Sequence, residues 1–214
     1  MATVVSPIPA NKPMPFVASV RRFACICVAL GSLGATTPTS WESSDPDGDH
    51  LTQRLEFRSE GARRWNPLAV AIEWNSYVFD TTRVADGRYE VHLTVSDTTD
   101  NAAGAVLTAT ATSAAFVIDN TPPSVTGLSA STEQDTVVRV SGRASDATSI
   151  VLSIRYSVNG GEWHTVLPAD GAADSATEPF EFGVSIADAG EHTIVVQVTD
   201  GALNRGAEQV TVQR

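Results

Sequence analysis

Cysteine is nearly absent from this sequence. The chain has 214 residues and only two cysteines, Cys25 and Cys27, with one residue between them. A disulfide between two such close residues has poor geometry, and no histidine or further cysteine completes a metal set with them. The sequence therefore excludes a disulfide framework and a zinc site built on cysteine.

Basic residues are also few. The chain carries 14 Lys and Arg against 25 Asp and Glu, which gives a net charge of -11. An acidic surface of this kind repels phosphates, so we expect no nucleic acid among the partners. With 42% hydrophobic residues the chain is too apolar to be disordered. It has no apolar run of the kind that a multi-span membrane protein needs, so we expect no stable membrane span in the mature chain.

The motifs of the common enzyme classes are missing as well. The sequence contains no GxSxG elbow, no HExxH helix and no phosphate-binding loop. The four histidines are His50, His92, His164 and His192. None has another histidine at zinc-ligand spacing. Carboxylates are abundant, but they fall in predicted turns, where solvent leaves them at ordinary acidity. We therefore expect a protein that is not an enzyme.

The N-terminal part of the chain differs in charge from the rest, because its first 41 residues carry three bases and no acid. Arg21 and Arg22 precede an apolar run at 23–33, which is typical of a secretion signal with cleavage near Gly34 or Ala35. Two alternatives are that this run is the first strand of the following domain and that the start codon is misassigned. We expect residues 1–35 to be a signal or unstructured, and the mature protein to be extracellular, cell-surface or periplasmic in a bacterium.

After residue 41 the dominant pattern is alternation of apolar and polar side chains. It occurs at 51–57, 89–95, 150–156 and 192–198. Alternation places one set of side chains on the core face of a strand. In the third segment the expected inward set is Ile150, Leu152, Ile154 and Tyr156. Short strands separated by Gly, Asp, Asn and Pro turns indicate a β-sandwich.

The two halves of the chain match each other. SWESSD at 40–45 matches SGRASD at 141–146, and DGRYEVHLTVSDTTDN at 86–101 matches AGEHTIVVQVTDGALN at 189–204. The matching segments lie about a hundred residues apart throughout, as expected for one fold copied twice with small changes in the loops.

A short segment, IDNTPPSV, lies between the two halves. Its Pro122-Pro123 pair fixes an extended backbone and removes two hydrogen-bond donors, so the segment should be a stiff linker. The sequence therefore predicts an all-β protein of two tandem antiparallel β-sandwich, immunoglobulin-like domains, a fibronectin type III-like one at 36–119 and an immunoglobulin-like one at 120–214.

Three stretches carry a resemblance to a known family: DPDGDHLTQRLEFRSEGARRWNPL, YVFDTTRVADGRYEVHLTVSDTTDN and FVIDNTPP. They resemble the tandem fibronectin type III and immunoglobulin-like modules of bacterial secreted proteins. The resemblance implies that Trp41 is the core tryptophan of the second strand and that Tyr89 ties the corner before the sixth strand. Gly142 and His192 stand at these positions in the second half, which therefore resembles a generic immunoglobulin-like domain more than a type III one.

Such pairs of modules resemble stalks or appendages of larger exported proteins. The resemblance implies a non-catalytic extracellular structural or adhesion module whose surface ligand, a protein or a glycan, is unknown. Two alternatives stay open. One is a carbohydrate-binding accessory module, and the other is a fragment of an exported enzyme that lacks its catalytic domain.

The densest group of acids is Asp45, Asp47 and Asp49, with Gly48 to turn the backbone. Calcium takes six to eight oxygen ligands and commonly uses such loops, so calcium is the one cofactor that this pattern suggests. Because no acid closes the loop as in an EF-hand, a polar turn between two strands is the favoured interpretation. Asp97 with Asn101 and Asp200 with Asn204 are interpreted as a turn shared by both domains.

Trp74 has no counterpart in the second half. With Tyr77 nearby it would form an exposed aromatic platform for a sugar ring, but an ordinary core tryptophan is the favoured interpretation, since large aromatic side chains usually bury most of their surface. Trp65 and Trp163 occupy matching places after a glycine-containing turn, so each is expected to pack on its own sheet.

Overall fold

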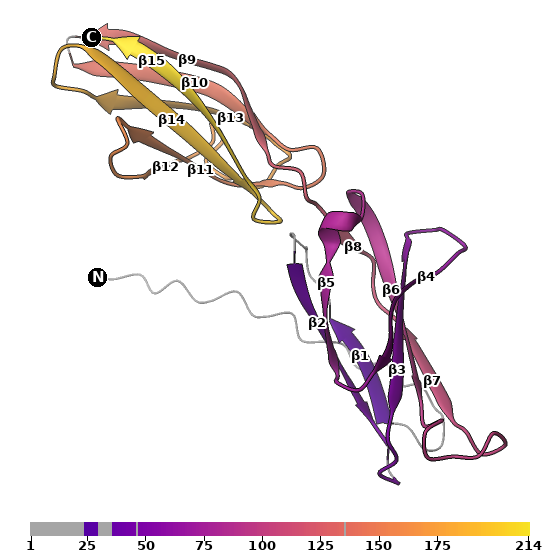
Figure 1. Cartoon of the computed structure of the whole chain (residues 1–214). Coiled ribbons are helices and arrows are strands. Elements are labelled where there is room, and N and C mark those ends of the chain that lie inside the picture. The colour runs from indigo at the N-terminus through magenta and orange to yellow at the C-terminus, as the bar shows by residue number, and fades with distance from the viewer. Residues whose placement is uncertain (1–23, 30–35, 46, 135) are drawn as a thin grey trace, which may run out of the picture. The chain divides into compact units, whose positions relative to one another are not determined.

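The structure is a computed structural model that describes residues 24–29, 36–45, 47–134 and 136–214 (Figure 1). The expected cleavage position near Gly34 lies outside these residues. The described chain divides into two compact units: unit 1 contains residues 24–29, 37–79 and 88–116, and unit 2 contains residues 36, 80–87 and 117–214. Within the described residues there is no α-helix, and none is therefore long and apolar enough to cross a membrane.

Unit 1 is built from two sheets. The three-stranded sheet has the order β1 (Ala24–Ala29), β2 (Thr36–Ser44) and β5 (Ser76–Asp80). The other sheet has the order β4 (Asn66–Ile72), β3 (Thr52–Ser59), β6 (Gly87–Ser96) and β7 (Thr108–Thr112), with β8 (Phe116–Ile118) pairing with β6. A short 3-10 helix, η1 (Thr81–Arg83), follows β5 and belongs to unit 2. Since β1 pairs antiparallel with β2, the apolar run at 23–33 contains a first strand, as one of the alternatives expected.

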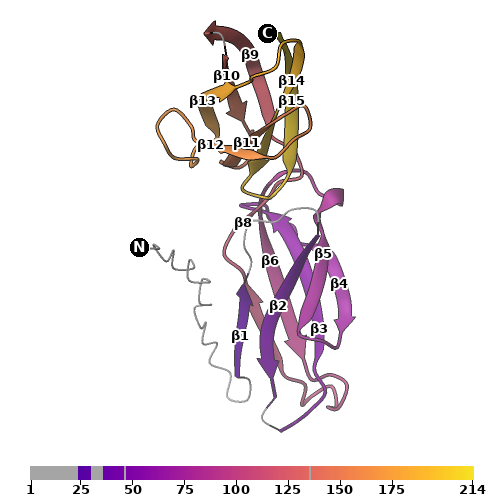
Figure 2. The same ribbon diagram turned by 90° about the vertical axis from the view of Figure 1, so that its left-hand side faces the viewer.

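Unit 2 repeats this arrangement (Figure 2). Its first sheet has the order β13 (Thr177–Ser185), β10 (Val137–Ser145) and β9 (Ser124–Gln134). Its second sheet has the order β12 (His164–Val166), β11 (Val151–Val158), β14 (Glu191–Asp200) and β15 (Arg205–Gln213). In both units the fourth strand lies beside the third, whereas in a constant-type immunoglobulin domain it pairs with the fifth. The prediction of two tandem antiparallel β-sandwiches is confirmed, and the two halves share one strand order.

The alternation predicted for the sixth strand of each unit is confirmed. In β6 the residues Tyr89, Val91, Leu93 and Val95 are all buried, and in β14 the same holds for His192, Ile194, Val196 and Val198. The polar residues between them are more exposed. Each buried aliphatic side chain of this size contributes roughly 1.5–3 kcal/mol, so these two strands form the centre of their cores.

The alternation predicted for 150–156 is wrong at its start. Ile150 and Leu152 are 42% and 46% exposed, whereas Val151 is fully buried. The pairing of β11 with β14 shifts register between Val151 and Ser153, which adds one residue to β11. A bulge of this kind exchanges the two faces of a strand, so the inward set changes from odd to even numbers only at Ile154.

The position of the core tryptophan is filled differently in the two units. Trp41 is 5% exposed, and its indole N–H donates to the side-chain oxygen of the buried Gln53. In unit 2 the matching residue is Gly142, and a Cβ atom added there would lie 2.7 Å from Cζ of Phe180. The buried Phe180 ring therefore occupies the space beside Gly142, and the glycine is required by this close approach.

Candidate metal centre

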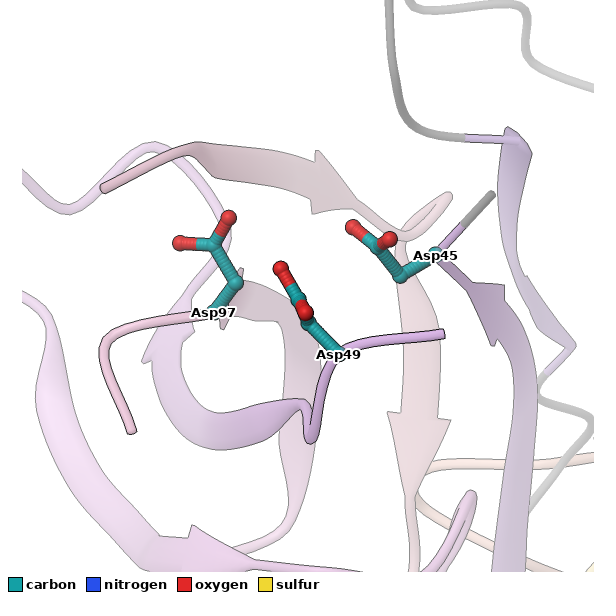
Figure 3. Close-up of side chains that lie close together, drawn as sticks. All are labelled: Asp45, Asp49 and Asp97. Carbon is teal, nitrogen blue, oxygen red and sulfur yellow. The ribbon is translucent and has the colours of Figure 1, made fainter. Parts of the chain in front are cut away.

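Three carboxylates of unit 1 converge at one place (Figure 3). Asp45 follows β2, Asp97 follows β6, and Asp49 lies in the loop before β3. One oxygen from each lies within 4.8 Å of one oxygen from each of the others. We call this group carboxylate group 1. The exposed Asp47, which the sequence suggested as a third ligand, is not part of it.

Hydrogen bonds hold each carboxylate of group 1 in place. Asp45 Oδ1 accepts from the N–H of Asp47 at 2.7 Å, so Asp47 serves the loop through its backbone. Asp49 Oδ2 accepts from the side-chain amide of Asn101 at 2.8 Å. Asp97 is 2% exposed, and its Oδ1 accepts from the N–H of Leu107 at 2.7 Å.

The spacing of group 1 matches that of the ligands of a divalent cation. Calcium–oxygen distances of about 2.3–2.6 Å place two oxygens on the same ion no more than about 5 Å apart. The loop itself has no closing acid, but Asp97, about fifty residues further along the chain, brings a third carboxylate to the same place. Calcium binding at Asp45 and Asp49 stays a prediction, and so does the role of Asp47.

The predicted Asp–Asn turns are present in both units. In unit 1 the side-chain amide of Asn101 lies 3.4 Å from the backbone oxygen of Asp97, to which it donates. In unit 2 the N–H of Asn204 donates to Asp200 Oδ1 at 2.8 Å. Sequence reasoning assigned these aspartates to turns alone and missed Asp97 as a member of group 1. The repeat offered a signal for it, because both aspartates recur at the matching positions of the second half: Asp45 matches Asp146, and Asp97 matches Asp200.

An ion pair lies beside group 1. His50 Nδ1 is 2.8 Å from Asp100 Oδ2, which also accepts from the N–H of His50 at 2.7 Å. The hydrogen bond and the charge of Asp100 raise the pKa of His50, and the charges of Asp49 and Glu73 raise it further. The backbone hydrogen bond from His50 lowers the pKa of Asp100. The pKa of His50 therefore depends on the charge of Asp49, a member of group 1.

Trp74 is 77% exposed, so the favoured interpretation of a core tryptophan is wrong. Hydrogen bonds connect its neighbour Asn75 to β2 and β3. Asn75 Oδ1 accepts from the hydroxyl of Ser43 in β2 at 2.8 Å and from the amide of Gln53 in β3 at 2.9 Å. The N–H of Trp41 also donates to the backbone oxygen of Asn75. With Asn75 fixed in this way, the turn before β5 leaves the indole of Trp74 in solvent.

Trp74 lines an open groove with a volume of about 970 Å³. The polar residues that share this groove include Asp45, Asp49, His50, Asn75 and Asp100. Tyr77 is not among its lining residues; it is half-buried, and its hydroxyl donates to the backbone oxygen of Leu68 at 3.5 Å. Trp74 therefore shares a groove with Asp45 and Asp49 of group 1 and not with Tyr77.

Trp65 and Trp163 each lie against an arginine of their own sheet, as predicted. The guanidinium carbon of Arg58 is 4.1 Å from the ring centroid of Trp65, and that of Arg155 is 4.5 Å from the ring of Trp163. Trp163 is 43% exposed, so neither indole resembles the buried Trp41. Stacking of this kind contributes about 0.5–1 kcal/mol at exposed sites.

No family model and no curated protein sequence matches this chain. Among solved structures, the chain is similar to the FN1–FN3 domains of chicken CNTN1, with 14% identity and a TM-score of 0.44, over 87% of this chain and 66% of that one. It is similar to the fibronectin(III)-like modules of Clostridium thermocellum CbhA with the same identity and TM-score, over 87% of this chain and 90% of that one. A two-domain fibronectin type III segment of chicken tenascin matches with 14% identity and a TM-score of 0.35, over 90% of this chain and 99% of that one.

Proposed function

We propose that this chain is a non-catalytic extracellular structural or adhesion module, a spacer in the stalk or appendage of a larger exported protein. The observation that carries the proposal is the path of the chain through unit 2. Pro123, just before β9, lies against Gly206 near the start of β15, because a Cβ atom at Gly206 would be 1.8 Å from the Pro123 oxygen. At the other end, the hydroxyl of Thr132 donates to the backbone oxygen of Gln213 at 3.5 Å.

The first and last strands of unit 2 therefore run side by side in the same direction. The chain enters the sandwich at one end and leaves it at the other. The 11 residues of β9 span about 35 Å at the usual rise per residue. A domain with this path adds its own length to any chain that contains it, which is the property that a spacer needs.

An extracellular location is supported by the N-terminal sequence, with its two arginines before an apolar run. Cleavage near Gly34 would remove β1 (Ala24–Ala29), so in this proposal β1 pairs with β2 only in the unprocessed chain. Fractionation of bacterial cells that express the full chain tests this location, together with the intact mass of the recovered protein. We expect protein outside the cytoplasm that has lost about 34 residues. Recovery of full-length protein from the cytoplasm alone would contradict export.

The spacer role is tested by placing one, two or three copies of the full chain between a membrane anchor and an epitope tag on the cell surface. We expect antibody access to the tag to rise with copy number, because each copy adds length. The control is a flexible Gly/Ser linker of equal residue count, whose end-to-end distance grows only with the square root of its length. Access that follows the linker control would refute the proposal.

A second candidate function is glycan binding, and the observation that favours it is the exposed Trp74 beside a polar groove. A sugar ring stacks on an exposed aromatic face, while carboxylate and amide groups of the groove accept and donate hydrogen bonds to its hydroxyls. In this candidate Trp74 is the platform, and the adjacent Asn75 supplies a side-chain amide of the groove. Tyr77 stays a predicted ligand residue although it lies outside the groove lining.

A glycan panel probed with the full chain and with Trp74→Ala tests the second candidate. We expect binding to be lost in Trp74→Ala and kept in Trp163→Ala, the matched control with an exposed indole elsewhere. Equal binding by all three proteins would exclude Trp74 as the platform, and absence of binding by the unaltered chain would leave the spacer role alone.

A further inference from the structure

Unit 2 contains a second convergence of carboxylates, which we call carboxylate group 2. Its members are Asp119 in the linker after β8, Asp146 directly after β10, and Asp200 at the end of β14. One oxygen of each lies within 4.8 Å of one oxygen of each of the others. Asp119 and Asp200 are fully buried, and Asp146 is half-buried.

Two members of group 2 are fixed by backbone donors. Asp200 Oδ1 accepts from the N–H groups of Ala202 at 2.9 Å and Asn204 at 2.8 Å, and its Oδ2 accepts from the side-chain amide of Asn204 at 2.9 Å. Asp146 Oδ1 accepts from the N–H of Ser149 at 2.7 Å. These bonds hold the carboxylates at the ends of their strands, so the group is preformed.

Two other carboxylate oxygens of group 2 have no donor among the described residues. Asp119 Oδ1 accepts from the N–H of Thr121 at 3.2 Å, but Asp119 Oδ2 and Asp146 Oδ2 are buried and have no hydrogen-bond partner in the described part of the chain. No ion pair found among the described residues includes any of the three aspartates. A buried acceptor without a donor is costly, and a charged one more so.

The electrostatics of Asp119 are consistent with a missing positive charge. Burial raises the pKa of Asp119, and the charges of Asp146 and Asp200 raise it further, while the hydroxyl of Ser149 and the N–H of Thr121 act in the opposite direction. Either a proton or a cation relieves this repulsion. One shared proton leaves two of the three carboxylates charged in a buried place, whereas a divalent cation attracts all three.

We propose that Asp119, Asp146 and Asp200 bind a calcium ion. The ligand atoms on offer are carboxylate oxygens, which hard cations prefer to the nitrogen and sulfur donors that zinc favours. Their spacing fits oxygens that share one calcium, and calcium accepts the irregular arrangement that three separate chain segments provide. Magnesium demands near-ideal octahedral geometry and keeps most of its water, so it fits a buried all-protein set less well.

Binding here would fix the linker segment of unit 2. Asn204 already donates from its side chain to the backbone oxygen of Asp119 at 3.0 Å, and the N–H of Asn120 donates to Asp86 Oδ1 at 2.8 Å. A calcium ion on Asp119 adds a bond from this segment to the ends of β10 and β14. Calcium is therefore expected to slow backbone exchange at residues 117–122.

The experiment is hydrogen–deuterium exchange of the full chain with calcium or with chelator, combined with equilibrium dialysis of calcium. We expect the peptides that cover 117–122 and 144–150 to become more protected with calcium, with a Kd of about 10⁻⁴ to 10⁻³ M, as in extracellular modules. Magnesium at the same concentration should give a smaller change. In Asp119→Asn we expect the calcium-dependent protection of both peptides to disappear.

Asp119→Asn is chosen because it keeps the oxygen that accepts from Thr121 and places an amide where the unpartnered oxygen is, so folding is preserved. Asp146→Asn is the second variant and should lose the response in the same way. Asp49→Asn, in group 1, is the matched control and should keep the response of the unit 2 peptides. If calcium leaves 117–122 and 144–150 unchanged, the proposal is wrong. A rise in their protection in Asp119→Asn with chelator would then show that the group shares a proton instead.

Discussion

The two units place aspartates at the same positions of the repeat but surround them differently. Asp45 and Asp97 in unit 1 match Asp146 and Asp200 in unit 2. The third carboxylate comes from a loop in unit 1 and from the linker in unit 2, at Asp119. The strand ends of this sandwich therefore bring two carboxylates together, and the segment that supplies the third decides how buried the group is.

Burial is the difference that matters chemically. In group 1 only Asp97 is buried, and water reaches Asp45 and Asp49. In group 2 two of three members are fully buried, and two of the group's oxygens have no donor among the described residues. Solvated carboxylates tolerate one another, whereas buried ones require a counter-charge or a proton. The same fold position thus holds a partly solvated carboxylate group in unit 1 and a largely buried one in unit 2.

The largest expected effect concerns the cores. Trp41→Ala should lower the free energy of unfolding of unit 1 by about 3–5 kcal/mol, because it removes a buried indole and one of the two donors to Gln53 Oε1. Trp163→Ala should cost at most about 1 kcal/mol, since that indole is half in solvent and contacts Arg155. Chemical denaturation measures both. Equal losses would mean that the two tryptophans have the same role, contrary to their burial.

A smaller effect is expected at the glycine that replaces the core tryptophan. Gly142→Ala should destabilise unit 2 by about 1–3 kcal/mol, because the added methyl group meets the Phe180 ring. Combining it with Phe180→Leu should cost less than the sum of the single changes. A double-mutant cycle by denaturation tests this coupling; strict additivity would show that the ring does not fill the tryptophan space.

The smallest expected effect is a shift in the titration of His50, and it tests whether group 1 binds calcium. Asp100 and Asp49 raise the pKa of His50, so calcium on Asp49 should lower it, and Asp100→Asn should lower it without calcium. Proton NMR of the His50 ring measures both shifts. An unchanged pKa of His50 at saturating calcium would indicate that group 1 is a polar turn only.

The raised pKa of His50 also makes the stability of unit 1 depend on pH. Its ordinary value is 6.5, and the folded value is higher. Its contribution to the stability of unit 1 is therefore complete below pH 6.5 and is lost as the pH rises through the folded value. Denaturation at a series of pH values should show this loss in the unaltered chain and a weaker one in Asp100→Asn.

Much of the fold follows from local sequence. Alternation identifies β6 and β14 because a side chain on every second residue faces the core, as Leu93 and Ile194 do. The same rule fails at Leu152, because a bulge depends on pairing with a strand far along the chain. Local rules carry no information about such a partner.

The sites were less predictable for the same reason. Asp45 and Asp49 are visible as a cluster in sequence, but Asp97 joins them only through the pairing of β3 with β6. The exposure of Trp74 depends on bonds from Asn75 to two other strands. Group 2 draws on three distant segments, so its recognition needed the repeat and the fold together.

The parallel course of β9 and β15 has a mechanical consequence. Tension applied where the chain enters and leaves unit 2 pulls these strands in opposite directions along their own axes. The ladder of β15 with β14, from Thr199 opposite Arg205 to Glu191 opposite Gln213, is then loaded in shear, with its hydrogen bonds strained together. A strand peeled from its end would instead lose them one at a time. Resistance to pulling depends on the rate of forced unfolding, so we expect unit 2 to unfold more slowly under tension than a domain whose terminal strand is peeled from its end.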